Sequence, residues 1–110
     1  MGVAGDMLLA ALLELCDSPG EILYKIGGMG ISGLEISSVK REREDLPGTQ
    51  IHVSVADDDV DTGRTLADVH RVIDGLAVSD KVKTDAKGVY QIIAEAEAVV
   101  HETDVECVHF

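Results

Sequence analysis

The sequence predicts an α+β fold with two N-terminal helices, a β-hairpin, two further helices and a short terminal strand. Apolar residues recur at helical spacing in four segments, whereas two central segments alternate apolar and polar residues at strand spacing. The helical and strand segments are also segregated along the chain, which is typical of α+β proteins. The chain has 110 residues, enough for one hydrophobic core, and we expect residues 1–110 to form a single domain.

The first two helices are indicated by their start signals. Residues 6–16 carry an apolar stripe at helical spacing, and Asp6 stands where a carboxylate can cap the first N–H groups. The side chains expected to face inward are Met7, Leu8, Ala11, Leu12 and Leu15. A second, short helix is predicted after Ser18-Pro19, because serine is a favoured N-cap and proline is tolerated in the first turn. Gly27-Gly28 is expected to end it.

A β-hairpin is expected next. Residues 34–41 and 51–55 are predicted as strands because β-branched and aliphatic residues alternate there with polar ones. Between them, Leu46-Pro47-Gly48-Thr49 places proline and glycine at the central positions that a type II turn prefers. Alternation in the second strand puts His52 on the face opposite the aliphatic residues.

Two helices and a strand complete the predicted order. Thr65 is expected to cap a helix that runs to Leu76, and Ser79 to begin the longest helix, which extends to about His101. The expected inner face of that helix consists of Val82, Ala86, Val89, Ile93, Ala96 and Val100. Residues 105–110 are predicted to form the terminal strand.

The composition excludes several classes of function. The formal net charge is −12 with only nine Lys and Arg residues, so binding to nucleic acids or to anionic membrane surfaces is disfavoured. No apolar run approaches the roughly 20 residues that span a bilayer, and no signal peptide is recognisable. We therefore expect a cytoplasmic protein in which Cys16 and Cys107 are free thiols. Such acidity suits metal cations or basic partners.

The C-terminal segment carries side chains that can bind a metal. His101 and His109 offer imidazole nitrogens, and Glu106-Cys107 between them offers a carboxylate and a thiol, all ligands of first-row metals such as nickel. The two histidines can converge across a short connection, but their spacing matches no tight zinc template. Local features favour a structural role for His101, which can complement the helix dipole and pair with Glu97.

Two other motifs have open interpretations. Gly2-Val3-Ala4-Gly5-Asp6 is either a tight turn before a helix or a contact for a ligand, since glycine lets backbone N–H groups approach an anion. In the acidic segment, Asp57, Asp59, Asp61 and Asp68 fit positions 1, 3, 5 and 12 of a calcium loop. Thr62 stands where that loop requires glycine, so a solvated acidic loop is the favoured interpretation.

Several motifs, taken in order, resemble one protein family. They are Gly2-Val3-Ala4-Gly5-Asp6-Met7, Leu46-Pro47-Gly48-Thr49, Gly63-Arg64-Thr65-Leu66-Ala67-Asp68-Val69, Val82-Lys83, Ala94-Glu95-Ala96-Glu97-Ala98-Val99-Val100-His101 and Glu106-Cys107-Val108-His109-Phe110. The set is similar to the N-terminal region of the nickel-insertion proteins for the nickel-pincer nucleotide cofactor, over nearly the whole chain. Family members usually have an apolar strand ahead of the first motif and continue past the last. We therefore expect the chain to be incomplete at both ends.

The resemblance implies a metallochelatase of the lyase class that loads Ni(II) into a pyridinium bis-thiocarboxylate mononucleotide, with CTP and Mg or Mn. It implies that Gly5 and Asp6 contact the cofactor and that His101 and His109 bind the metal, with His70 a further candidate. A missing C-terminal region or a split partner subunit would complete the site, and the chain alone is expected to be inactive. The alternative is a non-catalytic structural or assembly domain that packs on a partner domain.

Overall fold

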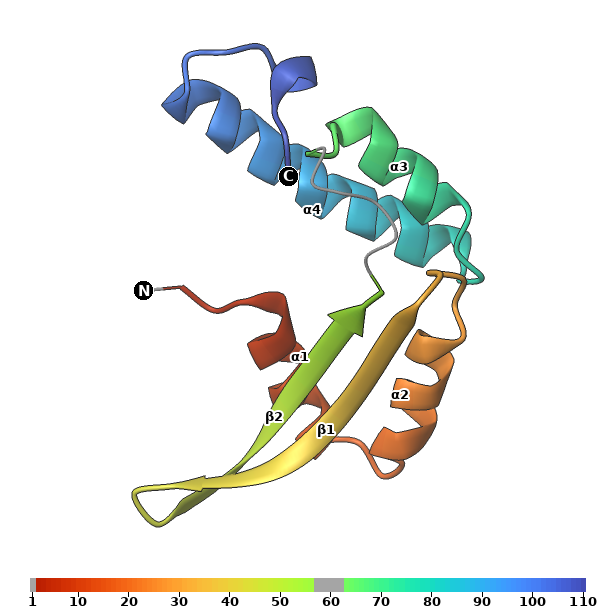
Figure 1. Ribbon diagram of the computed structural model, residues 1–110, viewed down its shortest axis with the longest axis vertical. Helices are drawn as coiled ribbons and strands as arrows, with labels where there is room; N and C mark the ends of the chain where they lie inside the picture. The colour runs from red at the N-terminus through yellow and green to blue at the C-terminus, as the bar shows by residue number, and fades with distance from the viewer. Residues whose placement is uncertain (1, 57–62) are drawn as a thin grey trace. The chain divides into compact units, whose positions relative to one another are not determined.

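The computed structural model describes residues 2–56 and 63–110 (Figure 1). The chain divides into two compact units, Met1–Asp57 (unit 1) and Asp58–Phe110 (unit 2), each described by itself. Two helices, a hairpin and two further helices follow one another in the predicted order, which confirms the α+β class. That the whole chain forms a single domain stays a prediction. The acidic segment with calcium-loop spacing lies almost wholly outside the described residues.

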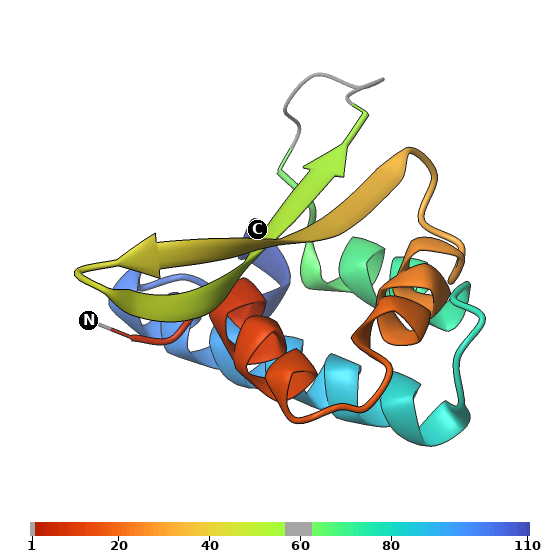
Figure 2. The ribbon, with the colours of Figure 1, turned by 90° about the horizontal axis from the view of Figure 1, so that it is seen from below.

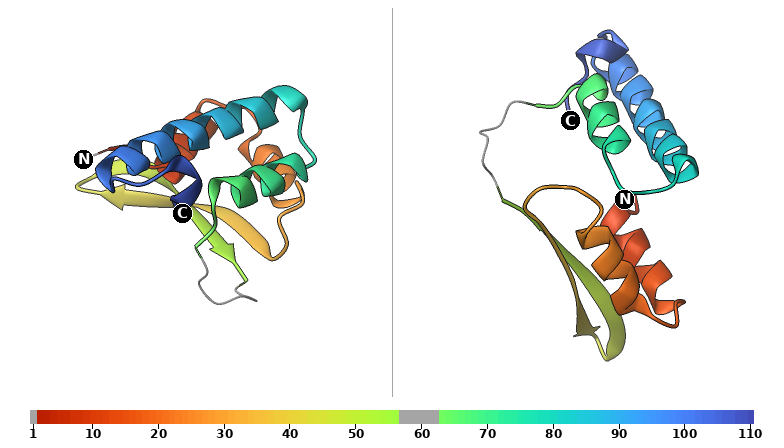
Figure 3. Two further views of the ribbon diagram at one scale, coloured as in Figure 1. Left: turned by 90° about the horizontal axis from the view of Figure 1, so that it is seen from above. Right: turned by 90° about the vertical axis from the view of Figure 1, so that its right-hand side faces the viewer.

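Unit 1 consists of two helices on one face of a β-hairpin (Figures 1 and 3). The helices are α1 (Gly5–Glu14) and α2 (Pro19–Gly27), and the strands are β1 (Leu34–Arg43) and β2 (Leu46–Val55). α1 packs against β2 and α2 against β1. The aliphatic core at this interface comprises Ala10, Leu13 and Ile51, surrounded by Leu9, Ile22, Leu23 and Ile36.

The hairpin turns at Glu44-Asp45, so the turn predicted at Pro47-Gly48 is wrong. Arg43 pairs with Leu46 across an antiparallel ladder, and Pro47-Gly48 lies within β2. Glu44 and Asp45 have φ values of 51° and 63°, the positive φ that a type I′ turn needs at both central residues. Such a turn matches the twist of the strands, which Figure 2 shows along the whole hairpin. Each strand of a two-stranded sheet has a free edge, where proline is tolerated.

The hairpin covers a different side of α1 from the predicted one. Ala10 and Leu13 are buried against it, 7% and 3% exposed. The predicted inward residues Met7, Leu8, Leu12 and Leu15 are instead 51–82% exposed. Apolar side chains occur on more than one side of this helix, so the spacing alone did not indicate which side the hairpin would cover.

Unit 2 contains α3 (Leu66–Asp74), α4 (Asp80–Val100) and a short 3₁₀ turn, η1 (Val105–Cys107). α3 begins with a capping box: the Asp68 backbone N–H donates to Thr65 Oγ1 over 3.3 Å, and the Thr65 N–H donates to Asp68 Oδ2 over 3.0 Å. The predicted Thr65 cap is therefore confirmed.

The start of α4 is also as predicted, because Ser79 Oγ accepts the N–H of Val82 over 3.3 Å. The inner face predicted for α4 is wrong. Ala94 and Ala98 are 0% and 7% exposed, whereas the predicted inward residues Val82, Val89 and Val100 are 50%, 56% and 74% exposed. Small alanine side chains let two packed helices approach closely, so the larger residues of α4 are left outside. In the described part of the chain, no helix is long and apolar enough to cross a membrane.

The predicted terminal strand is reduced to one bridge. Residues 105–107 form η1, and only His109 pairs in β fashion, opposite Thr65. The pairing cannot continue beyond Thr65, because α3 begins at the next residue and takes up the backbone groups in its own hydrogen bonds.

Candidate functional site

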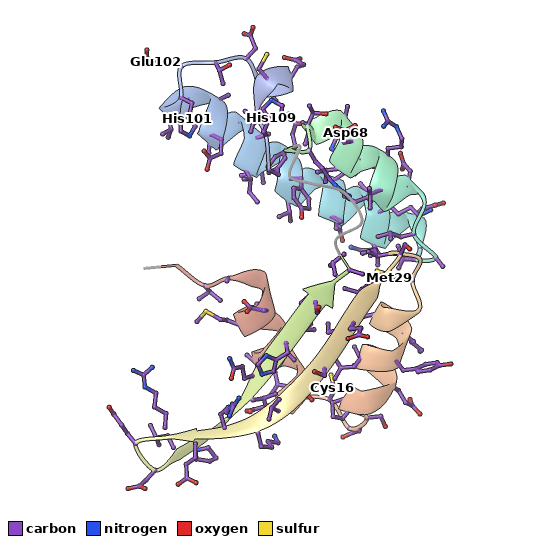
Figure 4. All side chains as sticks on the ribbon, in the orientation of Figure 1. Cys16, Met29, Asp68, His101, Glu102 and His109 are labelled. Carbon is purple, nitrogen blue, oxygen red and sulfur yellow. The ribbon has the colours of Figure 1, made fainter. Side chains whose placement is uncertain are left out.

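His109 is held by the segment that leads into α3 (Figure 4). Its Nδ1 lies 3.1 Å from the carbonyl oxygen of Gly63. That contact depends on the absence of a side chain at Gly63, because a Cβ there would lie 2.9 Å from His109 Cβ and 3.4 Å from its Cγ. Since a carbonyl only accepts, Nδ1 carries the proton, and Nε2 of the neutral ring is left with its lone pair.

The residues on either side of His109 anchor it to unit 2. Val108 is buried, 5% exposed. Phe110 and Arg64 exchange backbone hydrogen bonds of 2.9 and 3.3 Å. The Phe110 ring also packs edge-to-face on Tyr90 of α4, with ring centroids 5.4 Å apart. Backbone and ring contacts together fix the position from which His109 projects.

His101 ends α4 and pairs with the preceding turn. Its Nε2 lies 3.1 Å from Glu97 Oε2 and its backbone N–H donates to Glu97 O over 2.9 Å, so the predicted pairing is confirmed. The chain then reverses through a Schellman motif, in which Glu102 takes a φ of 51° and the Thr103 N–H bonds to Ala98 O over 3.0 Å. The contact with Glu97 uses Nε2, so Nδ1 is the ring nitrogen of His101 that this contact does not involve.

The two histidines are thus held by different partners, His101 by α4 and His109 by the segment before α3 (Figure 4). Within residues 2–56 and 63–110, no three His, Cys, Asp or Glu side chains are close enough to hold a metal ion. That His101 and His109 converge on one nickel ion stays a prediction.

Gly5 and Asp6 belong to unit 1, in the first turn of α1. The N-cap position is Ala4, which makes no side-chain cap bond. Asp6 caps one of the first N–H groups of α1, as predicted: its Oδ1 accepts the N–H of Met7 over 2.9 Å, and its negative charge complements the positive end of the helix dipole. A Cβ at Gly5 would meet nothing within 4 Å, which leaves space for an approaching ligand. That these residues share a cation site with the histidines stays a prediction.

Both cysteines are free thiols, as predicted. Cys16 lines a cavity of about 450 Å³ in unit 1, formed by the end of α1, the start of α2 and the hairpin. On its wall, Lys40 Nζ donates to Thr49 Oγ1 over 3.1 Å and Thr49 donates to Glu14 Oε1 over 2.7 Å. This polar cluster was not predicted, because 35 residues separate Glu14 from Thr49 and no local pattern links them.

Two aspartates of α3 have lowered pKa values: Asp68 in its first turn and Asp74 at its last residue. The pKa of Asp68 lies below its usual value, first because the Thr65 backbone N–H and hydroxyl bond to the carboxylate, and further because of Arg71. The pKa of Asp74 is lowered mainly by its hydrogen bond from Lys87. Both aspartates therefore stay ionised well into the acid range.

A conserved-sequence model described as nickel insertion protein matches residues 1–110, so the chain belongs to the nickel insertion protein family. A relative from Acetivibrio thermocellus, named pyridinium-3,5-bisthiocarboxylic acid mononucleotide nickel insertion protein, is 34% identical over 116 residues. Putative nickel insertion proteins from Geobacter sp. strain M21 and Dictyoglomus thermophilum are 37% and 31% identical. Each match covers 99% of this chain but 28% of the relative, so the chain spans little more than a quarter of their length. No solved structure gave a significant match.

Proposed function

We propose that this chain is the N-terminal domain of a metallochelatase, a lyase-class protein that inserts Ni(II) into pyridinium-3,5-bisthiocarboxylic acid mononucleotide. The names of its relatives support the metal and the substrate. The observation that carries a role in metal handling is the contact between His109 Nδ1 and Gly63 O, 3.1 Å long. A backbone carbonyl on one ring nitrogen is the common way to orient a metal-binding imidazole, because it fixes the tautomer and raises the basicity of the other nitrogen.

In this proposal His109 Nε2 and one nitrogen of His101 bind Ni(II), a metal ion for which imidazole is a suitable ligand. Both histidines are exposed, so a metal can reach them from solvent. His101 binds either through Nδ1 or after Glu97 releases Nε2, and the released carboxylate is then a further oxygen ligand. Gly5 and Asp6 contact the cofactor. The remaining ligands come from the rest of the polypeptide or a partner subunit, and CTP with Mg or Mn, implied by the resemblance, acts in that completed cytoplasmic enzyme.

Calorimetric titration with Ni(II) tests this assignment. We expect His109→Ala and His101→Ala each to weaken nickel binding, and binding in the unaltered chain to weaken as the pH falls through the imidazole range, because a protonated ring cannot bind metal. His52→Ala is the matched control, since His52 is an exposed histidine on β2 with no proposed role. Equal nickel affinity in the two site variants and the control would contradict the proposal.

A second candidate function, a non-catalytic assembly domain, is favoured by the apolar face of α4. Val89, Ile92 and Val99 are 56%, 69% and 79% exposed on one 21-residue helix. Apolar patches of this kind mark interfaces. In this proposal the region absent here but present in the longer relatives covers that face.

Light scattering of a mixture with the C-terminal region of a full-length relative separates these two functions. Ile92→Lys is expected to weaken the complex and leave nickel affinity unchanged, whereas Thr84→Lys, an exposed polar position on α4, is expected to change neither. A complex that forms equally well with Ile92→Lys would refute this interface, and self-association of the chain alone would show that a second copy covers the face instead.

A further inference from the structure

A second cavity lies within unit 2, where α3, α4 and η1 pack together. Its volume is about 360 Å³, and its lining residues are Leu66, Ala67, His70, Gln91, Val105 and Glu106. Leu66 and His70 are four residues apart on α3, so one face of the helix presents both to the cavity. His101 and His109, the two residues proposed above to bind nickel, do not line this cavity, whereas His70, the further candidate from the sequence, does.

One atom in this cavity lacks a partner. Among the residues that the structure describes, His70 Nε2 is the only buried side-chain nitrogen or oxygen without a hydrogen bond. Leaving such a group unsatisfied costs about 1–3 kcal/mol. Buried polar atoms without a protein partner are usually satisfied by a water molecule, an ion or a ligand.

The other polar side chains that line the cavity, Gln91 and Glu106, each carry oxygen atoms that can bind a metal ion. Gln91 Nε2 donates to Glu95 Oε1 over 2.8 Å, so the amide oxygen of Gln91 is left for the cavity. Glu106 makes no ion pair within residues 2–56 and 63–110. Asp74, four residues after His70 on α3, is already paired with Lys87. The cavity therefore offers an imidazole nitrogen, an amide oxygen and a carboxylate.

We propose that this cavity is a second metal site, in which His70 Nε2 binds a divalent first-row transition-metal ion with Glu106 and Gln91 as oxygen ligands. The carboxylate and the net charge of −12 disfavour an anion here. The imidazole favours zinc, cobalt or nickel over magnesium or calcium, which prefer oxygen ligands alone. With three protein donors, water or a donor atom of a second molecule completes the coordination. This site stands independently of His101 and His109.

The probe is Zn(II) or Co(II) alone, added to a variant that carries both His101→Ala and His109→Ala. Zn(II) is expected to shift the ¹⁵N resonance of His70 Nε2 and to leave the His52 resonances unchanged. Adding His70→Ala is expected to weaken Co(II) binding at least about tenfold, since removing even an outer-shell partner of a metal costs about 10–100-fold in affinity.

Glu106→Gln keeps the side-chain shape and removes one charge on an exposed residue, so it tests the site without the risk of unfolding α3. We expect weaker Co(II) binding with an unchanged circular dichroism spectrum. A His70 Nε2 resonance that does not move at saturating Zn(II) would overturn the proposal and leave water as the partner. Undiminished Co(II) binding in both His70→Ala and Glu106→Gln would overturn it as well.

Discussion

Replacing Gly63 with alanine is expected to weaken nickel binding at His109 without unfolding unit 2. The new Cβ would lie 2.9 Å from His109 Cβ, and 3.5 Å from Nδ1. Carbon atoms in ordinary contact are about 3.5–4.0 Å apart, so His109 must move by roughly 1 Å. That shift breaks the bond between Nδ1 and Gly63 O, which fixes the tautomer.

The magnitude follows from two terms. Overpacking of this size lowers the free energy of unfolding by about 1–3 kcal/mol. Alanine also lowers the conformational entropy of the unfolded chain, which offsets about 0.4–1 kcal/mol of that loss. We therefore expect the free energy of unfolding to fall by roughly 0–2.6 kcal/mol. Loss of the partner that orients a metal-binding imidazole lowers metal affinity about 10–100-fold, so a nickel affinity at least about tenfold weaker is expected.

Urea unfolding followed by circular dichroism measures the first quantity, and calorimetry with Ni(II) the second. Gly88→Ala is the matched control: a Cβ at Gly88 on α4 would meet nothing within 4 Å, and alanine in a helix is about 0.5–1 kcal/mol more favourable than glycine. This control should become more stable and bind nickel unchanged. Nickel affinity that is unaltered in a folded Gly63→Ala protein would refute the reasoning, because it would mean that the Gly63 contact does not orient a metal ligand.

Three further outcomes are expected. Thr65→Ala removes the capping box of α3 and should lower the free energy of unfolding by about 0.5–2 kcal/mol in urea. Because the pKa of Asp68 is lower in the folded protein, its stabilisation is fully present above the ordinary value of 3.8 and lost as the pH falls through the folded pKa. The stability difference between the unaltered protein and Asp68→Asn should therefore shrink as the pH falls below 3.8, and a difference of the same size in acid and at neutral pH would contradict this. Glu102→Gly should raise the melting temperature, since a left-handed non-glycine residue carries about 1–2 kcal/mol of strain.

The features that could be predicted from the sequence depend on neighbouring residues. Thr65 and Ser79 cap their helices as expected because a cap is decided within one helical turn. The Glu97–His101 pair was predictable for the same reason. The hairpin turn was not, since Pro47-Gly48 is a strong local turn signal that the pairing of two ten-residue strands outweighs.

The features that could not be predicted depend on distant contacts. Gly63 and His109 are 46 residues apart, and only the fold brings them together. The inner face of α4 was missed for a related reason: the apolar spacing indicates which side chains avoid water, not whether α3 or another surface covers them. Ala94 is fully buried against neighbours that no periodicity in α4 could specify.

The reciprocal hydrogen bonds between Arg64 and Phe110 bring the first and last described segments of unit 2 together. Its topology is therefore that of a nearly closed ring, and a circular permutation is compatible with it. Residue 110 could be linked to residue 63 and the chain reopened in the connection between α3 and α4, with every contact of His109 retained. Such a rearranged polypeptide would carry the imidazole in its interior, away from either end of the permuted chain.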